Sequence, residues 1–219
     1  MKATRKEHDF LGELEIPNEV YYGVQTFRAI ENFNITGIPI SKEPLFIKAL
    51  GYVKKAAAMA NKDCGVLDAK IAEAICYGSD QLIAGKFDQE FVSDLIQGGA
   101  GTSVNMNANE VIANIGLEYL GHKKGEYQYL HPNNHVNCSQ STNDAYPSAF
   151  RIALYLKMES FLTTLEELEK AFTAKGREFS KVLKMGRTQL QDAVPMTLGQ
   201  EFHAYATTIG EDIKRLKEA

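Results

Sequence analysis

The chain has 219 residues, of which 44% are hydrophobic and 24% are charged, so it can build one large globular domain or two smaller ones. Its 24 basic and 28 acidic residues give a net charge of -4 without a long Lys/Arg block, which argues against nucleic acid or an anionic membrane as a partner. No apolar stretch could cross a bilayer, and the N-terminus lacks an apolar signal core. The three cysteines lack metal-type spacing, which favours a reducing, cytoplasmic location.

Residues 1–45 show little helical periodicity and contain three glycines and three prolines, which favours an irregular or partly extended arm. Apolar residues then recur at helical spacing, and this pattern predicts a first helix that ends near residues 63–65. Asp68 is expected to cap a second helix and Gly85 to stop it, because glycine readily adopts the left-handed conformation that follows a helix. A short third helical piece is expected at residues 91–96.

A glycine-rich segment, residues 98–101, precedes a helix that is predicted to run from Thr102 to about Tyr119. The segment lacks the Lys-Ser/Thr ending of a phosphate loop and does not follow a predicted strand. Within the helix, Thr102, Asn105 and Asn109 share one face. This polar stripe leaves two interpretations open: a solvated surface, or one wall of a polar pocket.

Seven consecutive small or polar residues, 138–144, stand directly before the clearest apolar periodicity of the chain. Asn143 or Asp144 is expected to cap the helix that follows. One cap needs only one such side chain. A helix N-terminus also carries unpaired N–H groups and a partial positive charge, which can hold a carboxylate or a phosphate. The run of polar residues therefore predicts an anion-binding surface in addition to a cap.

After this polar run, apolar residues alternate at spacings of four and three and predict a long helix that continues to about Val182. Such a seam is typical of a helix packed nearly parallel or antiparallel to others in a bundle. Residues 184–187 are expected to break the helix, and residues 188–195 to form a connecting loop. Thr197 and Gln200 then match a capping box that opens a second long helix.

The second long seam has no partner of matching length except its predecessor, and it reaches Ala219 without a terminating Gly, Asn or Pro. We therefore expect the chain to be a fragment of a longer bundle protein. The predicted fold is mainly α. A small helical N-terminal domain with an irregular arm, residues 1–139, precedes the first long helices of a truncated helix-bundle domain, residues 140–219.

Three junctions share uncharged hydrogen-bonding side chains where a helix begins or a loop turns: residues 101–103, 141–143 and 187–189. The histidines are scattered, and His131 and His135 are expected to be loop or capping residues rather than metal ligands, so no metal site is predicted. No Ser-His-Asp arrangement is supported. The three junctions are therefore the candidate site.

The residues around these junctions resemble successive motifs of the aspartase/fumarase superfamily. The three resembling segments are Gly99–Asn107, Ser139–Asp144 and Gly186–Ala193, and residues 9–13 and 21–29 also match. The similarity covers essentially the whole chain in the right order, which makes the resemblance specific. It implies a helix-bundle lyase.

Within the superfamily, Ser103-Val104, Thr142–Asp144 and Gln189 resemble the members that eliminate ammonia from L-aspartate. Gln189 replaces a His that many members carry, and a Gln side chain can only form hydrogen bonds. Asn134 stands where fumarases usually have Asp. The implied reaction is therefore reversible carbon–nitrogen cleavage of L-aspartate to fumarate. A class II fumarase-type hydratase, a non-catalytic helical-bundle oligomer and a dicarboxylate-binding protein are the alternatives.

Removing the Cβ proton of L-aspartate builds a second negative charge on the neighbouring carboxylate, and preorganised donors must stabilise it. The resemblance assigns substrate binding to hydroxyl, amide and guanidinium groups in these motifs: Thr102, Ser141 and Thr142 for the β-carboxylate, Asn143, Thr188 and Gln189 for the amino group and the α-carboxylate, and, more weakly, Arg28.

The resemblance also implies what this chain lacks. The superfamily's general base is a serine on a downstream Gly-Ser-Ser-x-Met-Pro loop, and no such loop occurs before Ala219. We therefore expect no catalytic base in this chain and no activity from the chain alone. The resemblance further implies a homotetramer with sites shared among three subunits and no required cofactor, and it leaves room for activation by a divalent cation.

Overall fold

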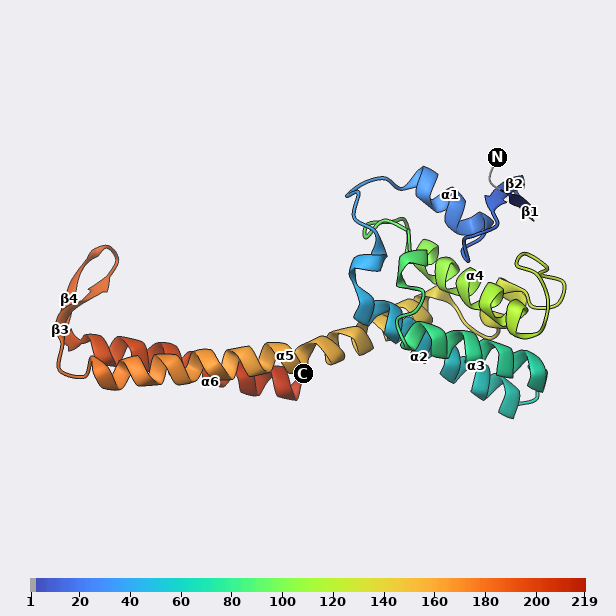
Figure 1. Cartoon of the computed structure of the whole chain (residues 1–219). Helices are drawn as coiled ribbons and strands as arrows, with labels where there is room; N and C mark the ends of the chain where they lie inside the picture. Colours follow the sequence, from blue (N-terminus) through green and yellow to red (C-terminus); the bar gives the residue numbers. More distant parts are fainter. Residues whose placement is uncertain (1–2) are drawn as a thin grey trace. The chain divides into compact units, whose positions relative to one another are not determined.

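The computed structural model describes residues 3–219, which form two compact units, residues 3–154 and 155–219 (Figure 1). The expected mainly α fold is confirmed. Helix α5 (Thr142–Glu178) contributes to both units. The predicted boundary at 139/140 lies just before the start of this helix, whereas the compact units meet between Leu154 and Tyr155. The first turns of α5 belong with the first unit because Ala149 and Ala153 are buried in its core.

The N-terminal segment is more regular than predicted. Strands β1 (Thr4–Asp9) and β2 (Gly12–Pro17) form an antiparallel hairpin, and helix α1 (Val24–Asn32) follows. The expectation of an irregular arm missed this helix because its start carries no capping side chain of its own: Gly23 precedes it. Its N–H groups are bound instead by carboxylates from distant parts of the chain.

Two buried glutamates hold the start of α1. Glu110 accepts hydrogen bonds from the N–H groups of Gly23, Gln25 and Thr26 and from the Thr26 hydroxyl, at 2.6 to 3.0 Å. Glu7 accepts from the Val24 N–H at 2.9 Å. A helix N-terminus carries partial positive charge, so these carboxylates satisfy both its free donors and its dipole. The hairpin and α1 are thereby tied to the centre of the first unit.

Three helices build the core of the first unit: α2 (Pro44–Asp63), α3 (Ala69–Ile83) and α4 (Thr102–Tyr119). Their predicted positions are confirmed. Asp68 caps α3 by accepting from the N–H groups of Lys70 and Ile71, and Gly85 has a φ of 70° just after the helix. Helix α4 is buried along most of its length and lies among the other elements of the unit (Figure 1).

Short elements complete the first unit: the 3-10 turns η1 (Ile40–Lys42) and η2 (Asp88–Glu90), and a π-helical turn, η3 (Pro132–Val136). The prediction of a helical piece at residues 91–96 is wrong. Asp94 forms a bridge with Pro39, and its carboxylate accepts from the N–H groups of Thr36 and Gly37. These tertiary contacts hold the segment extended although its apolar spacing suggested a helix.

The second unit contains the rest of α5, strands β3 (Leu183–Thr188) and β4 (Gln191–Thr197), and helix α6 (Leu198–Glu218). Helices α5 and α6 lie side by side (Figure 1), with the Phe172 and Phe202 rings 5.9 Å apart. The predicted capping box is confirmed: the Thr197 hydroxyl accepts from the Gln200 N–H, and the Gln200 side chain accepts from the Thr197 N–H.

Two predictions for this unit are wrong. The long helix ends at Glu178 and not near Val182, and residues 188–195 belong to the β3–β4 hairpin rather than a loop. Gln189 and Leu190 form its two-residue turn, with φ values of 48° and 63°. Positive φ at both positions matches the twist of the paired strands, although neither residue is the usual Asn or Gly. Within residues 3–219, no helix is both long and apolar enough to span a membrane.

Candidate functional site

The sequence-predicted site residues are divided between the two units. Thr102 begins α4, and Ser141, Thr142 and Asn143 stand at the start of α5, so both junctions belong to the first unit. Thr188 and Gln189 lie at the tip of the β3–β4 hairpin in the second unit, which is described by itself. Within the first unit, the candidate site therefore consists of the α4 and α5 N-termini.

The cap of α5 is Ser141, which corrects the prediction of Asn143 or Asp144. The Ser141 hydroxyl accepts from the Asn143 N–H at 3.2 Å, and the Asp144 carboxylate accepts from the Ser141 N–H at 3.1 Å. This reciprocal pair resembles a capping box, with the Ser141 hydroxyl bound by the N–H of the second helical residue rather than the third. The side chains of Thr142 and Asn143 are not needed for capping, and that of Asn143 is exposed.

A buried polar network lies beneath Thr142. Its centre is the Asn137 Oδ1 atom, which accepts from Lys54 Nζ at 3.0 Å, from Asn105 Nδ2 at 3.1 Å and from Asn109 Nδ2 at 3.2 Å. Asn105 Nδ2 also donates to Thr142 Oγ1 at 3.3 Å. Asn105 and Asn109 are buried and Thr102 is exposed, so the polar stripe of α4 is a floor under the junction rather than a solvated surface.

Sequence reasoning missed Lys54. Its side chain is fully buried, and it donates to Asn137 Oδ1 and to Gln140 Oε1, each at 3.0 Å. Burial lowers the pKa of Lys54 to about 7, although the charge of Asp144 opposes this shift. The signal was available, because Lys54 stands four residues from both Leu50 and Ala58 on the buried face of α2.

The glycine-rich segment fixes the start of α4. Gly101 is buried with a φ of +90°, and an added Cβ would collide with the ring of Tyr146. Because Gly101 has no side chain to cap α4, Gln97 Oε1 accepts from the Val104 N–H at 2.8 Å instead. The N-termini of α4 and α5 are thus held together by the contact between Gly101 and Tyr146.

We expect Gly101→Ala to destabilise the first unit by about 2–5 kcal/mol, because overpacking against the Tyr146 ring costs about 1–3 kcal/mol and the positive φ of Gly101 adds about 1–2 kcal/mol. Gly99→Ala is the matched control. Gly99 also has a positive φ, but its added Cβ would only reach ordinary contact with Thr102, so only the backbone cost of about 1–2 kcal/mol remains. Urea unfolding of the two variants measures the difference, and equal losses would show that the Tyr146 contact does not matter.

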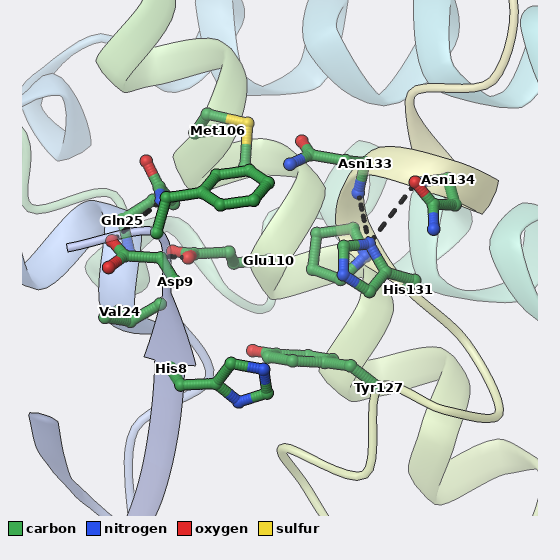
Figure 2. A pocket seen from close by; sticks show the side chains of 12 residues that line it. His8, Asp9, Val24, Gln25, Met106, Glu110, Tyr127, His131, Asn133 and Asn134 are labelled. Carbon is green, nitrogen blue, oxygen red and sulfur yellow. Dashed lines mark hydrogen bonds between the residues drawn. The ribbon is translucent and has the colours of Figure 1, made fainter. Parts of the chain in front are cut away.

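A separate pocket of about 290 Å³ lies between β1, α1, α4 and η3. Figure 2 shows side chains from these elements around it, with Glu110 and Tyr127 facing His8 and Asp9 of β1. None of the seven predicted site residues lines it. His131 Nδ1 accepts from the N–H groups of Asn133 and Asn134, drawn as dashed lines in Figure 2, which confirms the predicted capping role of His131. Burial lowers its pKa, so the ring is neutral at neutral pH.

Arg28 takes part in a structural ion pair. Its Nε donates to Asp9 Oδ2 at 2.9 Å, and its Nη2 donates to Asp9 Oδ1 at 3.1 Å and to the Gly12 carbonyl oxygen at 3.2 Å. Within the described part of the chain, the hydrogen bonds of Arg28 thus go to the β1–β2 hairpin and not to the α4 or α5 junction. Among residues 3–219, no group of three or more His, Cys, Asp or Glu side chains is placed to hold a metal ion.

A helical unit with uncharged donors gathered at two helix N-termini is suited to a lyase that acts on a carboxylate. The chain belongs to the lyase family whose model matches residues 12–219. Over 215 residues it is 62% identical to an aspartate ammonia-lyase from Pseudomonas fluorescens, an alignment that covers 98% of this chain and 45% of that protein. It therefore spans about half the length of the curated relatives that it matches.

Two solved structures are similar over nearly the whole chain. A fumarate lyase:delta crystallin from Brucella melitensis shares 54% identity with a TM-score of 0.90, covering 99% of this chain and 50% of that one. A class II fumarase from Schistosoma mansoni shares 34% identity with a TM-score of 0.86, covering 97% of this chain and 44% of that one. The fold expected from the resemblance is therefore confirmed by solved relatives.

Proposed function

We propose that the whole protein is an aspartate ammonia-lyase and that this chain contributes the part of its site that binds carboxylate. The observation that supports this most is the α5 N-terminus, where the Ser141 and Asp144 side chains cap the backbone and leave the Thr142 side chain over a buried network of amide groups and Lys54. The 62% identity to a relative with that name supports the substrate, because the motif residues lie inside the aligned region.

The proposed reaction begins with removal of a Cβ proton from L-aspartate. Negative charge then builds on the β-carboxylate, and the partial positive charge of a helix N-terminus favours it. Hydroxyl donors at Thr102, Ser141 and Thr142 would bind that carboxylate without the reorganisation that water would need. Thr188 and Gln189 of the hairpin would bind the remainder of the substrate, and the base would come from elsewhere in the whole protein.

The test uses the full-length protein with L-aspartate and L-malate in parallel, with fumarate followed by its ultraviolet absorbance. We expect fumarate from L-aspartate only. Fumarate from L-malate only would move the protein to the fumarase-type hydratases and leave Gln189 unexplained. Silence with both substrates from a folded protein would favour a non-catalytic helical-bundle oligomer, or a dicarboxylate-binding protein if succinate still binds.

The same proposal extends to the protein's compartment, oligomeric state, cofactors and partners. We propose a cytoplasmic homotetramer that needs no cofactor, with divalent cations as activators at most and with no nucleic acid or membrane partner. The exposed apolar side chains of Phe161, Leu168 and Tyr205 on α5 and α6 support association with further helices. The free thiols of Cys64, Cys76 and Cys138 support a reducing compartment.

A further inference from the structure

The network beneath Thr142 has a fixed direction, because it includes a backbone carbonyl that can only accept. Asn137 Nδ2 donates to that carbonyl, of Gln140, at 3.0 Å. On the other side of the same amide, Lys54 Nζ donates to Asn137 Oδ1 at 3.0 Å. The Asn137 amide therefore has one orientation, with its oxygen toward Lys54, Asn105 and Asn109.

The Gln140 side chain supports this orientation independently. Its Nε2 donates to the carbonyl oxygens of Val136 at 2.9 Å and Cys138 at 3.2 Å, which leaves its Oε1 to accept from Lys54. Lys54 thus has an acceptor oxygen from each of two amides. The centre of the network is closed to bulk solvent, because Lys54 and Asn105 are 0% and 1% exposed.

The orientation of Asn137 decides that of Asn105. Because Asn137 presents an oxygen, Asn105 must present its Nδ2 and not its Oδ1. The second hydrogen of the same NH₂ group then points to Thr142 Oγ1, 3.3 Å away. The Oδ1 atoms of both Asn105 and Asn109 stay buried without a hydrogen-bond partner among the described residues. A buried unpaired oxygen costs free energy, so this orientation is maintained by the rest of the network.

We propose that Asn105 is a positioning residue that turns the hydroxyl proton of Thr142 toward the substrate carboxylate, with the Gln140 backbone carbonyl setting the direction of the hydrogen bonds through Asn137. A threonine hydroxyl has one hydrogen and two lone pairs. The amide of Asn105 occupies a lone pair on the protein side, so the hydroxyl hydrogen is left to point away from the network. Thr142 is thereby prepared as a donor before any substrate arrives. The inference rests on the proposed function.

Asn109 offers a matched control on the same helix. It is also buried, it also donates from Nδ2 to Asn137 Oδ1, and its Oδ1 is also unpartnered among the described residues, but its Nδ2 also bonds Met106 Sδ, at 3.5 Å, where that of Asn105 bonds Thr142. Asn105→Leu and Asn109→Leu therefore remove the same bond to Asn137 and the same amide, without adding charge. Only Asn105→Leu also removes the bond to Thr142.

The experiment measures kcat and KM for L-aspartate and the dissociation constant of succinate for the full-length protein and both variants. We expect Asn105→Leu to weaken succinate binding and lower kcat/KM by about 10- to 100-fold, the scale of one hydrogen bond to a charged group. For Asn109→Leu, the losses in succinate binding and in kcat/KM should be smaller than those of Asn105→Leu by at least about tenfold. Equal losses from the two variants would overturn the proposal, since they would reflect the shared packing role.

A double-mutant cycle completes the test and separates positioning from stability. If Asn105 acts through the Thr142 hydroxyl, Asn105→Leu should have little further effect on succinate binding in a Thr142→Ala background. If Asn105→Leu weakens succinate binding in that background as much as it does in the wild type, the proposal is overturned. A wild-type protein that makes no fumarate but binds succinate would refute the proposed function, and the double-mutant cycle would still test the role of Asn105. A wild-type protein that binds neither L-aspartate nor succinate would refute both the proposed function and the positioning role of Asn105.

Discussion

Thr142→Ala in the full-length protein is expected to lower turnover of L-aspartate by about 100- to 1,000-fold, the cost of removing one preorganised donor from a developing anion. The hydroxyl stands in the first turn of α5, where the helix dipole and the bond from Asn105 both prepare it to donate. Because alanine is a better helix former than threonine and Ser141 remains as the cap, folding should not suffer.

Two further variants make this prediction specific. Thr142→Ser keeps the hydroxyl and should retain most of the activity. Thr164→Ala lies on the same helix, where the Thr164 hydroxyl is exposed and donates only to the Ser160 carbonyl oxygen, so turnover should hardly change. Fumarate production at saturating L-aspartate is the measurement. Near-normal turnover by Thr142→Ala would remove Thr142 from the site.

Glu110→Ala is expected to lower the free energy of unfolding by about 3–5 kcal/mol. Glu110 is completely buried and accepts from two buried N–H groups and from the hydroxyl of Thr26. Each buried donor that loses its acceptor costs about 1–3 kcal/mol. The loss should appear in urea unfolding of the 219-residue chain, with the circular dichroism of the helices as the signal. A change below about 1 kcal/mol would mean that α1 does not depend on this carboxylate.

The pH dependence of stability gives a second check on Glu110. Complete burial, which outweighs the opposing hydrogen bond from Thr26, raises its pKa to about 7 from the usual 4.5. A carboxyl with a raised pKa binds a proton more tightly in the folded state, so its contribution is present below about pH 4.5 and is lost as pH rises through about 7. We therefore expect the stability of the wild type relative to Glu110→Gln to fall between pH 5 and pH 8. A constant difference would contradict the raised pKa.

Helix α1 illustrates a limit of structure prediction from sequence patterns. Helix α1 begins at Gly23 without a capping side chain, and its acceptors Glu7 and Glu110 come from β1 and α4. An added Cβ at Gly23 would approach Glu7 Oε2 to 2.5 Å, so the glycine is required for the two carboxylates to reach the backbone. Residues 18–32 contain no capping signal that predicts this helix, because the two carboxylates that bind its first N–H groups are 17 and 87 positions away in the chain.

The sequence by itself determined the features that depend only on residues close together along the chain. The caps at Asp68 and Thr197, the start of α4 at Thr102 and the motifs of the lyase family are all local patterns, and the structure agrees with them. Local patterns succeed here because a helix end must satisfy its free N–H groups within a few residues.

Only the tertiary structure decided what lies beneath those motifs. Lys54 and Asn137 are 83 positions apart, yet their bond is part of the buried network that ends at Thr142. The helical spacing of α2 places Lys54 on the buried face, but it does not identify the two amide oxygens that bind the side chain. The residues of the candidate site therefore stand in local sequence motifs. Their preorganisation depends on burial, which only the folded structure provides.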